Sequence, residues 1–401
     1  MSTTETTRGC PVHNFNPLEE LPVGEKIAAY DRLRDEAPVI WNDFASGYYV
    51  VTRHEEILSV YQDPETFSNR AVTVFDPDPS YKWIPEMLDG DEHLQWRKQL
   101  GPVFSPKAIE KLEAKVRQRA IDLIDGIVAK GTGSCDFMAE FAFQYPTSIF
   151  LDLMGLPIED LPQFMEWEHE ILHVAASGEE ASRRRGVAMA AVNSYFDGVI
   201  ADRRANPGGD DLVSKALSFQ IDGAPVTDAD MGSFCLLLFM AGLDTVSATL
   251  GLSFLHLASH PEDRRRIVAE PSLIPTAIEE FIRAYAIVIP ARKATKDTEI
   301  GGCPIKAGSM IAAPLNAATR DGATFDDPKN VDIRRTPNNH IGFGAGPHRC
   351  LGSHLARREL KIALEEWHAR IPDYYLSADS APTESGGQLG PNAGITLLWK
   401  Q

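Results

Sequence analysis

The pattern of apolar and polar positions predicts a mainly helical chain. Apolar residues recur at spacings of three and four, as on the buried face of an α-helix, over residues 26–34, 106–129, 193–205, 228–258, 275–284 and 351–370. Short runs of β-branched and aromatic residues predict strands at 38–41, 48–52, 294–300, 309–315 and 395–399, the first two as a hairpin. Strands and helices do not alternate, so we expect a mainly α fold with a small β portion.

The segment 228–258 is the most apolar of these and would form a helix of about 45 Å at roughly 1.5 Å per residue. Thr227 is a candidate N-cap, followed by two aspartates in the first turn, where the helix dipole favours carboxylates. A helix that is apolar on all sides is expected to run through the protein interior. Residues 234–258 are also long enough to cross a bilayer, but Asp244 near their middle would be costly in lipid. We therefore expect no membrane span.

Composition and charge narrow the classes of function. The 43% of hydrophobic and 24% of charged residues are ordinary for a globular protein, and the net charge of -18 argues against a nucleic-acid partner. Five dispersed cysteines and an N-terminus without a signal-peptide pattern predict a reduced, cytoplasmic protein. A length of 401 residues by itself suggests two domains. Residues 1–22 are polar and Pro-rich and predict a loosely held arm, while 175–186 and 206–211 are typical of loops.

The strongest chemical signal is the segment FGAGPHRCLG, residues 343–352, directly before the last long helix. Two glycines bracketing Ala345 let the backbone pass close to a large flat ligand. Cys350 then lies near a helix N-terminus, beside Arg349 and His348, a setting that favours a metal-binding thiolate. For a cysteine taken alone, the alternative is a buried structural thiol next to a Gly-rich turn.

This segment resembles the haem-binding loop of the cytochrome P450 family, F-G-x-G-x-H-x-C-x-G, with six fixed residues matched in ten positions. The resemblance implies haem b (iron protoporphyrin IX) with Cys350 as the metal ligand. It also implies that the other matched residues of the loop bind the cofactor: Phe343, Gly344, Gly346, His348 and Gly352. The implied architecture is the cytochrome P450 fold, in which a long central helix crosses over a buried haem.

The central helix carries a second match, AGLDT at residues 241–245, to the family pattern A-G-x-D-T. The small Gly242 and a polar pair inside an apolar helix indicate a local opening of the helix beside a cavity. The resemblance implies catalytic roles for both polar residues: Thr245 orients the proton network, and Asp244 relays protons from solvent. The alternative is a Thr245 hydroxyl bonded back to its own helix and an Asp244 buried in a salt bridge.

The sequence Glu280-Phe-Ile-Arg283 matches the E-x-x-R helix of the family, and a spacing of three puts both side chains on one helical face. The resemblance joins this pair to an arginine upstream of the haem loop. Arg335 fits that place better than Arg334. We expect the three residues to lock the ligand loop, a structural role.

The resemblance also supplies donors for the two haem propionates. His93 and Arg97 are four residues apart, on one face of a helix that begins near Asp91. Arg292 follows the E-x-x-R helix, and His348 lies in the ligand loop. Each alone is more often a solvated surface residue, but together they supply the positive charge that a dianionic haem edge requires.

The resemblance extends from Ala29 to Trp399, so we expect one cytochrome P450 domain over residues 1–401 rather than two domains. No flavin- or iron–sulfur-binding segment is evident, so a ferredoxin and a ferredoxin reductase are the expected electron donors. Basic residues near His93 and Cys350 are candidates for the docking patch: Lys98, Lys107, Arg349, Arg357 and Arg358.

The expected function is a hydroxylase: a haem-thiolate monooxygenase that inserts one oxygen atom from O2 into a small, largely apolar substrate, terpene-like or aromatic. By resemblance, the substrate walls are residues 72–87, 237–245, 286–291 and 389–392. Two alternatives stay open: a peroxide-driven or rearranging haem-thiolate enzyme, and a non-catalytic haem-binding sensor. The pattern His169-Glu-Ile-Leu-His173 would also suit a zinc hydrolase, although no third ligand is evident.

Overall fold

The computed structural model describes residues 9–173, 179–384, 389–391 and 393–400. The α-helices are α1 (Glu25–Glu36), α2 (His54–Gln62), α3 (Gly90–Leu100), α4 (Pro106–Glu110), α5 (Glu113–Ala129), α6 (Gln144–Met154), α7 (Leu161–Glu168), α8 (Glu179–Ala205), α9 (Leu212–Ala216), α10 (Asp228–Gly242), α11 (Asp244–Ser259), α12 (Pro261–Ala269), α13 (Ile274–Ala284), α14 (Leu315–Thr319) and α15 (Ser353–Arg370). Short π-helical turns lie at Met138–Ala142 and His169–His173, and 3-10 turns at Ile158–Asp160 and Pro271–Leu273. The prediction of a mainly helical chain is confirmed.

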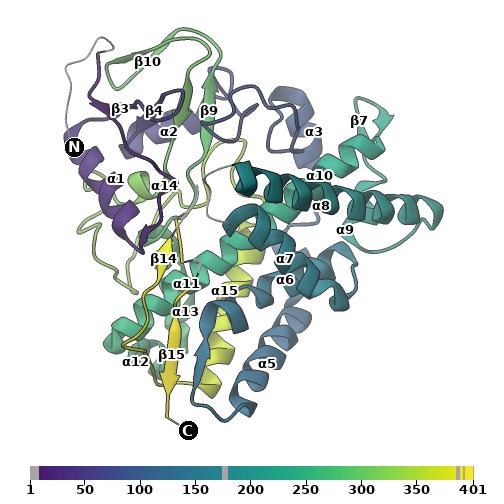
Figure 1. Cartoon of the computed structure of the whole chain (residues 1–401), viewed down its shortest axis with the longest axis vertical. Coiled ribbons are helices and arrows are strands. Elements are labelled where there is room, and N and C mark those ends of the chain that lie inside the picture. The colour runs from purple at the N-terminus through teal and green to yellow at the C-terminus, as the bar shows by residue number, and fades with distance from the viewer. Residues whose placement is uncertain (1–8, 174–178, 385–388, 392, 401) are drawn as a thin grey trace.

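The strands are short and gather in a few small sheets. They are β1 (Val12–His13), β2 (Leu21–Pro22), β3 (Val39–Asn42), β4 (Tyr48–Val51), β5 (Phe67–Ser68), β6 (Ser134–Asp136), β7 (Gln220–Ile221), β8 (Ala224–Pro225), β9 (Ala291–Ala294), β10 (Thr298–Ile300), β11 (Cys303–Ile305), β12 (Met310–Ala312), β13 (Tyr374–Leu376), β14 (Thr383–Glu384) and β15 (Thr396–Trp399). The largest sheet has six strands in the order β1-β3-β4-β12-β9-β5. Figure 1 shows β3, β4 and β9 beside α1 and α2, with β14 and β15 in the lower part of the molecule and most of the helices on the other side of these strands.

The hairpin predicted near the start is confirmed as β3 and β4, which pair antiparallel with Val39 opposite Val51. The expectation of a loosely held arm over 1–22 is wrong for residues 9–22. Val12 pairs with Trp41 through β1 and β3, and β2 pairs with β14. Backbone hydrogen bonds to two sheets therefore hold this segment in place, and residues 1–8 lie outside the described part of the chain.

Several other segments predicted as single elements consist of two elements in the structure. The helix expected over 106–129 is two helices, α4 and α5. The strand expected over 294–300 is the end of β9 followed by β10, which pair in different sheets. The segment 309–315 contains β12 and then enters α14, and the loop expected over 175–186 belongs to α8 from Glu179 onward. A hydrophobic pattern reports which face is buried, and it does not report where the chain changes partners.

The long apolar helix predicted over 228–258 is confirmed in extent but is broken into α10 and α11 at Leu243. Thr227 caps it in a capping box with Asp230, whose backbone N–H donates to the Thr227 hydroxyl at 3.1 Å. The stretch Asp228–Ser259 is long and apolar enough to cross a membrane, and 61% of its most apolar window is buried inside the fold. It packs against α6, α8, α13 and α15, as expected of a core helix.

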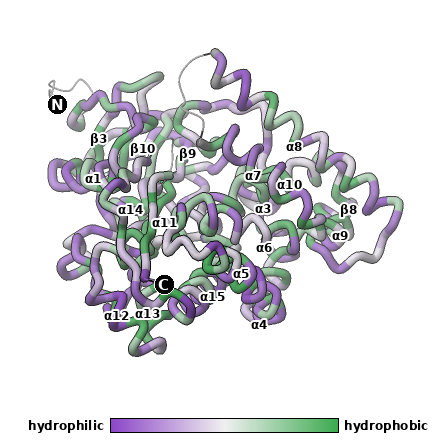
Figure 2. Tube along the Cα trace, turned by 60° about the horizontal axis from the view of Figure 1, so that its bottom comes forward, coloured by the Kyte–Doolittle hydropathy of each residue, from purple (hydrophilic) through white to green (hydrophobic). Residues whose placement is uncertain are grey.

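Three clusters of buried apolar side chains form the interior, and the central helix contributes to all of them. Ala248 belongs to the cluster around the large sheet, Leu250 to the cluster beneath α15, and Leu243 to the cluster between α6 and α8. The cysteine loop is shared in the same way, through Ala345, Phe343 and Leu351. In Figure 2 the purple, hydrophilic stretches lie mainly at the periphery, for example along α8 and α12. The central helix and the loop are thus the elements that connect the three clusters.

Candidate functional site

One face of the central helix is open although the helix runs through the interior. Leu237, Ala241, Thr245 and Thr249, spaced by four, are all partly or fully accessible, whereas most residues around them are buried. Residues spaced by four share one helical face. This stripe therefore borders an interior space, and the predicted opening of the helix at Gly242 lies on it.

The acid–alcohol pair lies at the break itself. The Thr245 hydroxyl donates to the Ala241 carbonyl at 3.0 Å, so the back-bonded alternative describes its present hydrogen bond. Asp244 is buried, 6% exposed, in the first turn of α11. Sequence reasoning missed Glu168 on α7: burial raises its pKa well above the usual range, and the charge of Asp244 raises it further.

The loop before α15 has the tight path expected from its glycines. Gly344 and Gly346 have φ values of 73° and 68°, in the left-handed region that favours glycine. A Cβ on Gly346 would lie 2.2 Å from the Tyr61 carbonyl oxygen, so only glycine fits there. The Cys350 N–H donates to the Phe343 carbonyl at 2.8 Å and closes the loop.

Cys350 is the exposed cysteine of the chain, whereas Cys10, Cys135, Cys235 and Cys303 are buried. It nevertheless lies deep among protein atoms, and this desolvation raises the pKa of its thiol. The Gly352 N–H, Arg97 and Arg349 act in the opposite direction but do not prevail. A thiol that is accessible although it lies deep can be reached by a bound ligand. Helix α15 begins at Ser353, three residues after Cys350, and a bound metal ion would displace the thiol proton to give the expected metal-binding thiolate.

The four expected propionate donors come together beside this loop. The rings of His93 and His348 are stacked with centroids 3.9 Å apart. Burial, His93 and the positive charges of Arg292 and Arg97 lower the pKa of His348 to about 2. Burial and Arg97 lower the pKa of His93 to about 4. Both imidazoles are therefore neutral at pH 7, and the positive charge of the group is carried by the two arginines.

Each arginine is oriented by the backbone. Arg97 donates to the Arg349 carbonyl at 2.7 Å, which ties α3 to the cysteine loop. Arg292 on β9 is 4% exposed, donates to the Ala291 carbonyl at 2.7 Å and lies over the Tyr61 ring, 5.0 Å from its centroid. Burial lowers the pKa of both guanidinium groups. A buried cation without a full set of partners attracts an anion.

Sequence reasoning also missed a carboxyl group in this cluster. Glu86 accepts from the Asn69 amide at 3.1 Å, and burial raises its pKa although Arg292 and Arg97 act to lower it. No motif marks Glu86 in the sequence, because it reaches the arginines only through the folding of the segment before α3.

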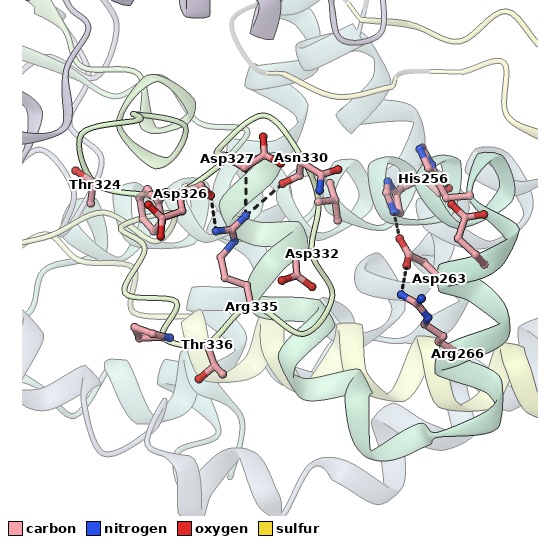
Figure 3. Close-up of a pocket in the computed structure, with 15 residues that line it drawn as sticks. His256, Asp263, Arg266, Thr324, Asp326, Asp327, Asn330, Asp332, Arg335 and Thr336 are labelled. Atoms are coloured by element: carbon pink, nitrogen blue, oxygen red, sulfur yellow. Dashed lines mark hydrogen bonds and ion pairs between the residues drawn. The ribbon is translucent and has the colours of Figure 1, made fainter.

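The E-x-x-R prediction and the choice of Arg335 are confirmed. Glu280 and Arg283 are fully buried and form a bidentate pair at 2.7 Å, and Arg335 donates to Glu280 at 3.0 Å. Figure 3 shows Arg335 reaching the backbone of Asp326, Asp327 and Asn330 in a polar cleft of about 700 Å³. None of the residues lining that cleft belongs to the cysteine loop or to residues 241–245, so it is not where the predicted chemistry would occur.

The basic residues expected to form a docking patch divide into two groups. Arg357 donates to Glu279 at 2.8 Å and lies over the Phe343 ring, and Arg358 pairs with Glu113. Both charges are engaged within the fold and only partly exposed, whereas Lys98, Lys107 and Arg349 are exposed, so the docking patch stays a prediction that rests mainly on these three.

The H-E-x-x-H pattern occupies a π-helical turn, in which Glu170 is paired with Arg184 at 2.7 Å. The His173 side chain lies outside what the structure describes. Within the described residues, no group of three or more His, Cys, Asp or Glu side chains could hold a metal ion.

The residues present fit a haem. Cys350 has an accessible thiol. Beside its loop lie two arginines and His348, whose ring nitrogens are buried without a hydrogen-bond partner. These groups are the donors that two propionates would satisfy. The thiolate of Cys350 would hold the iron of the haem.

Comparison with known proteins agrees with this geometry. The family model described as cytochrome P450 matches residues 38–367. The chain is 35% identical to the probable cytochrome P450 127A1 of Sinorhizobium fredii, over 94% of this chain and 91% of that protein. It is 31% identical to a methyl-branched lipid omega-hydroxylase of Mycobacterium bovis, over 88% and 86%. The crystal structure of CYP101J2 superposes with a TM-score of 0.87 at 32% identity, covering 99% of this chain and all of that one.

Proposed function

This chain belongs to the cytochrome P450 family of haem-dependent monooxygenases and has its fold, and from that premise we propose that it inserts one oxygen atom of O2 into a small, largely apolar substrate. The family implies a haem cofactor. We infer haem b, because the sequence contains no C-x-x-C-H segment for covalent attachment. Once bound through Cys350, the haem supplies the activation of dioxygen.

The residues of this chain hold the cofactor and control protons around it. We assign ligation of the iron to Cys350, support of the loop backbone to Phe343, Gly344, Gly346 and Gly352, and propionate binding to His93, Arg97, Arg292 and His348. The proximity of the two arginines and the stacked histidines supports the last assignment.

Proton delivery is assigned to Asp244 and Thr245 at the break in the central helix. The Thr245 hydroxyl is on the open stripe and bonds to the carbonyl of Ala241. A hydroxyl that donates to one acceptor keeps its lone pairs available to accept a hydrogen bond from a donor in the adjacent space. Asp244 next to it is buried, so it exchanges protons through neighbouring groups rather than directly with bulk water.

The proposed substrate is apolar, because the walls assigned by sequence are apolar where they meet. The Leu389 N–H donates to the Ile287 carbonyl at 2.9 Å, and a Cβ on Gly390 would lie 2.6 Å from that of Ala248. The segment Val288–Pro290 is partly accessible and carries no charge. The methyl-branched lipid named for one relative is an apolar substrate of this kind. Of the aromatic side chains in the assigned wall 72–87, Tyr81 and Trp83 contact each other, whereas Phe75 packs on Tyr48 in the sheet lobe.

We further propose a single domain, a cytoplasmic location and electron supply by a ferredoxin with its reductase. The central helix and the cysteine loop are shared by all three apolar clusters, which supports one cooperative unit. Lys98, Lys107 and Arg349 remain as an exposed basic group in a protein of net charge -18, which suits an acidic donor.

The observation that carries the proposal is the accessible, deep thiol of Cys350 in a fold whose central helix opens at Asp244 and Thr245. The test supplies NADH or NADPH, a ferredoxin and its reductase under 18O2, with candidate apolar compounds chosen by their shift of the Soret band. We expect oxygen uptake coupled to a product that carries one labelled oxygen atom.

The alternatives predict different results. A peroxide-driven enzyme would form the product with hydrogen peroxide and without the electron donors. A rearranging enzyme would form a product without label, and a sensor would bind ligands without turnover. Any of these three results would overturn the monooxygenase proposal.

A further inference from the structure

Glu168, the last residue of α7, is a carboxyl group that the proposed mechanism does not yet use. It is 2% exposed, and both carboxyl oxygens are fully buried, with the Thr147 hydroxyl as their nearest polar neighbour. Burial raises its pKa well above the usual range, and the charge of Asp244 raises it further, whereas Thr147 has a small opposite effect. Such a group is costly to keep ionised.

The packing of α7 on the central helix brings the two acids together. Phe164, one turn before Glu168, contacts Phe239 of α10 with ring centroids 5.7 Å apart. Phe239 precedes Asp244 by five residues, so the two helices meet next to the break. The fold thereby places a second buried acid beside the acid of the A-G-x-D-T motif.

The charged groups of the surrounding elements are engaged elsewhere. On α8, Arg184 pairs with Glu170, and on α6, Asp152 pairs with Arg119. The Thr147 hydroxyl of α6 donates to the Phe143 carbonyl at 2.6 Å. Within the described residues, the one charge that acts on Glu168 is therefore that of Asp244.

We propose that Glu168 is a positioning residue that carries a proton while Asp244 carries the negative charge, so that the buried pair holds a single charge. Two carboxylates close together in a site of low dielectric do not both ionise readily. The neutral Glu168 keeps Asp244 in one state from which it accepts and passes on a proton. This inference rests on the proposed function, in which Asp244 is the proton relay.

The first test needs no turnover. Infrared spectra of the holoprotein at pH 7 are compared with those of Glu168→Gln and of a matched control on the same helix, Glu166→Gln, whose side chain is exposed. We expect a neutral carboxylic acid band in the native protein and in E166Q that is lost in E168Q. Absence of a difference between native protein and E168Q would mean that Glu168 is ionised, which overturns the inference. If E168Q does not fold, Glu168→Asp replaces it, and the band must then shift in frequency.

Stability against pH gives a second readout. The pKa of Glu168 is higher in the folded than in the unfolded chain, so the folded state binds the extra proton and the native protein loses stability as the pH rises above about 4.5. E168Q should remove this contribution, and its stability should fall less than that of the native protein between pH 5 and 8. An unchanged slope counts against a protonated Glu168.

The third readout is the pH profile of coupled product formation. Ionisation of Glu168 would put two charges on the pair. In the native protein, the fraction of electrons that ends in product should therefore fall by up to tenfold per pH unit on the alkaline side. This fraction should not depend on pH in E168Q, and it should still fall at alkaline pH in E168D. A merely structural role would lower all three profiles alike. If the native protein shows no oxygenation, the proposed function fails while the infrared result still decides the state of Glu168. If oxygenation occurs with identical native and E168Q profiles, only this inference fails.

Discussion

The buried Glu280–Arg283–Arg335 cluster gives the sharpest prediction of stability. Glu280 and Arg283 are both 0% exposed, and Glu280 also accepts from the Asp332 N–H at 2.8 Å and from the Asn338 amide at 3.1 Å. Glu280→Gln preserves the shape but leaves two arginines facing an amide. Removal of one partner from a buried pair costs about 3–5 kcal/mol, which is a large part of the roughly 5–15 kcal/mol that stabilises a typical protein.

The matched control is Glu270→Gln, which breaks the pair with Arg334 at 3.0 Å, where both side chains are more than half exposed. Such surface pairs contribute about 0–1 kcal/mol. Urea unfolding of the holoprotein, followed by the Soret band and by tryptophan fluorescence, should show a much larger decrease of the unfolding midpoint for E280Q than for E270Q. Equal midpoints for the two variants would refute the assigned role of the buried cluster.

Three further predictions follow from single contacts. Gly346→Ala should lose most of its haem, because its Cβ would overlap the Tyr61 carbonyl. Gly344→Ala adds only the strain of a left-handed backbone, about 1–2 kcal/mol, and should retain its haem. The ratio of Soret to protein absorbance measures the haem content of both variants. Burial lowers the pKa of His368 to about 4, so below pH 6.5 the unfolded chain binds a proton that the folded chain does not. Native stability should fall from pH 6.5 towards 4, and His368→Gln should flatten that slope in urea titrations. Lys98→Glu should slow the reduction of the protein by ferredoxin about tenfold or more at low salt, as measured by stopped flow. At high salt the two rates should become equal, because salt screens the charge. Rates that do not depend on salt would contradict docking at Lys98.

The features that the sequence predicts well are local ones. The cysteine loop, the Thr227 cap, the β3–β4 hairpin and the opening at Gly242 each depend on residues within a few positions of one another. Helix capping, turn geometry and periodicity act over such distances, so a single sequence contains the information. The E-x-x-R pair belongs here as well, since its two members share one helical turn.

The features that the sequence does not predict depend on contacts between distant segments. Arg358 looks like a free surface charge in the sequence but pairs with Glu113, 245 residues away. Glu86 approaches the arginines through the folding of the segment before α3, and Glu168 approaches Asp244 through a contact between separate helices. The raised pKa of the Cys350 thiol likewise depends on how deeply the fold surrounds the loop, which the neighbouring residues in the sequence do not report.

The central claim, that Cys350 is the thiolate ligand of a haem, is tested most directly by the carbon monoxide difference spectrum of the reduced protein. We predict the thiolate-type Soret band in the native protein and its loss in Cys350→Ala, with Cys235→Ala, a buried cysteine of the same chain, unchanged. A native spectrum without that band, or a C350A spectrum that retains it at full intensity, would contradict the account.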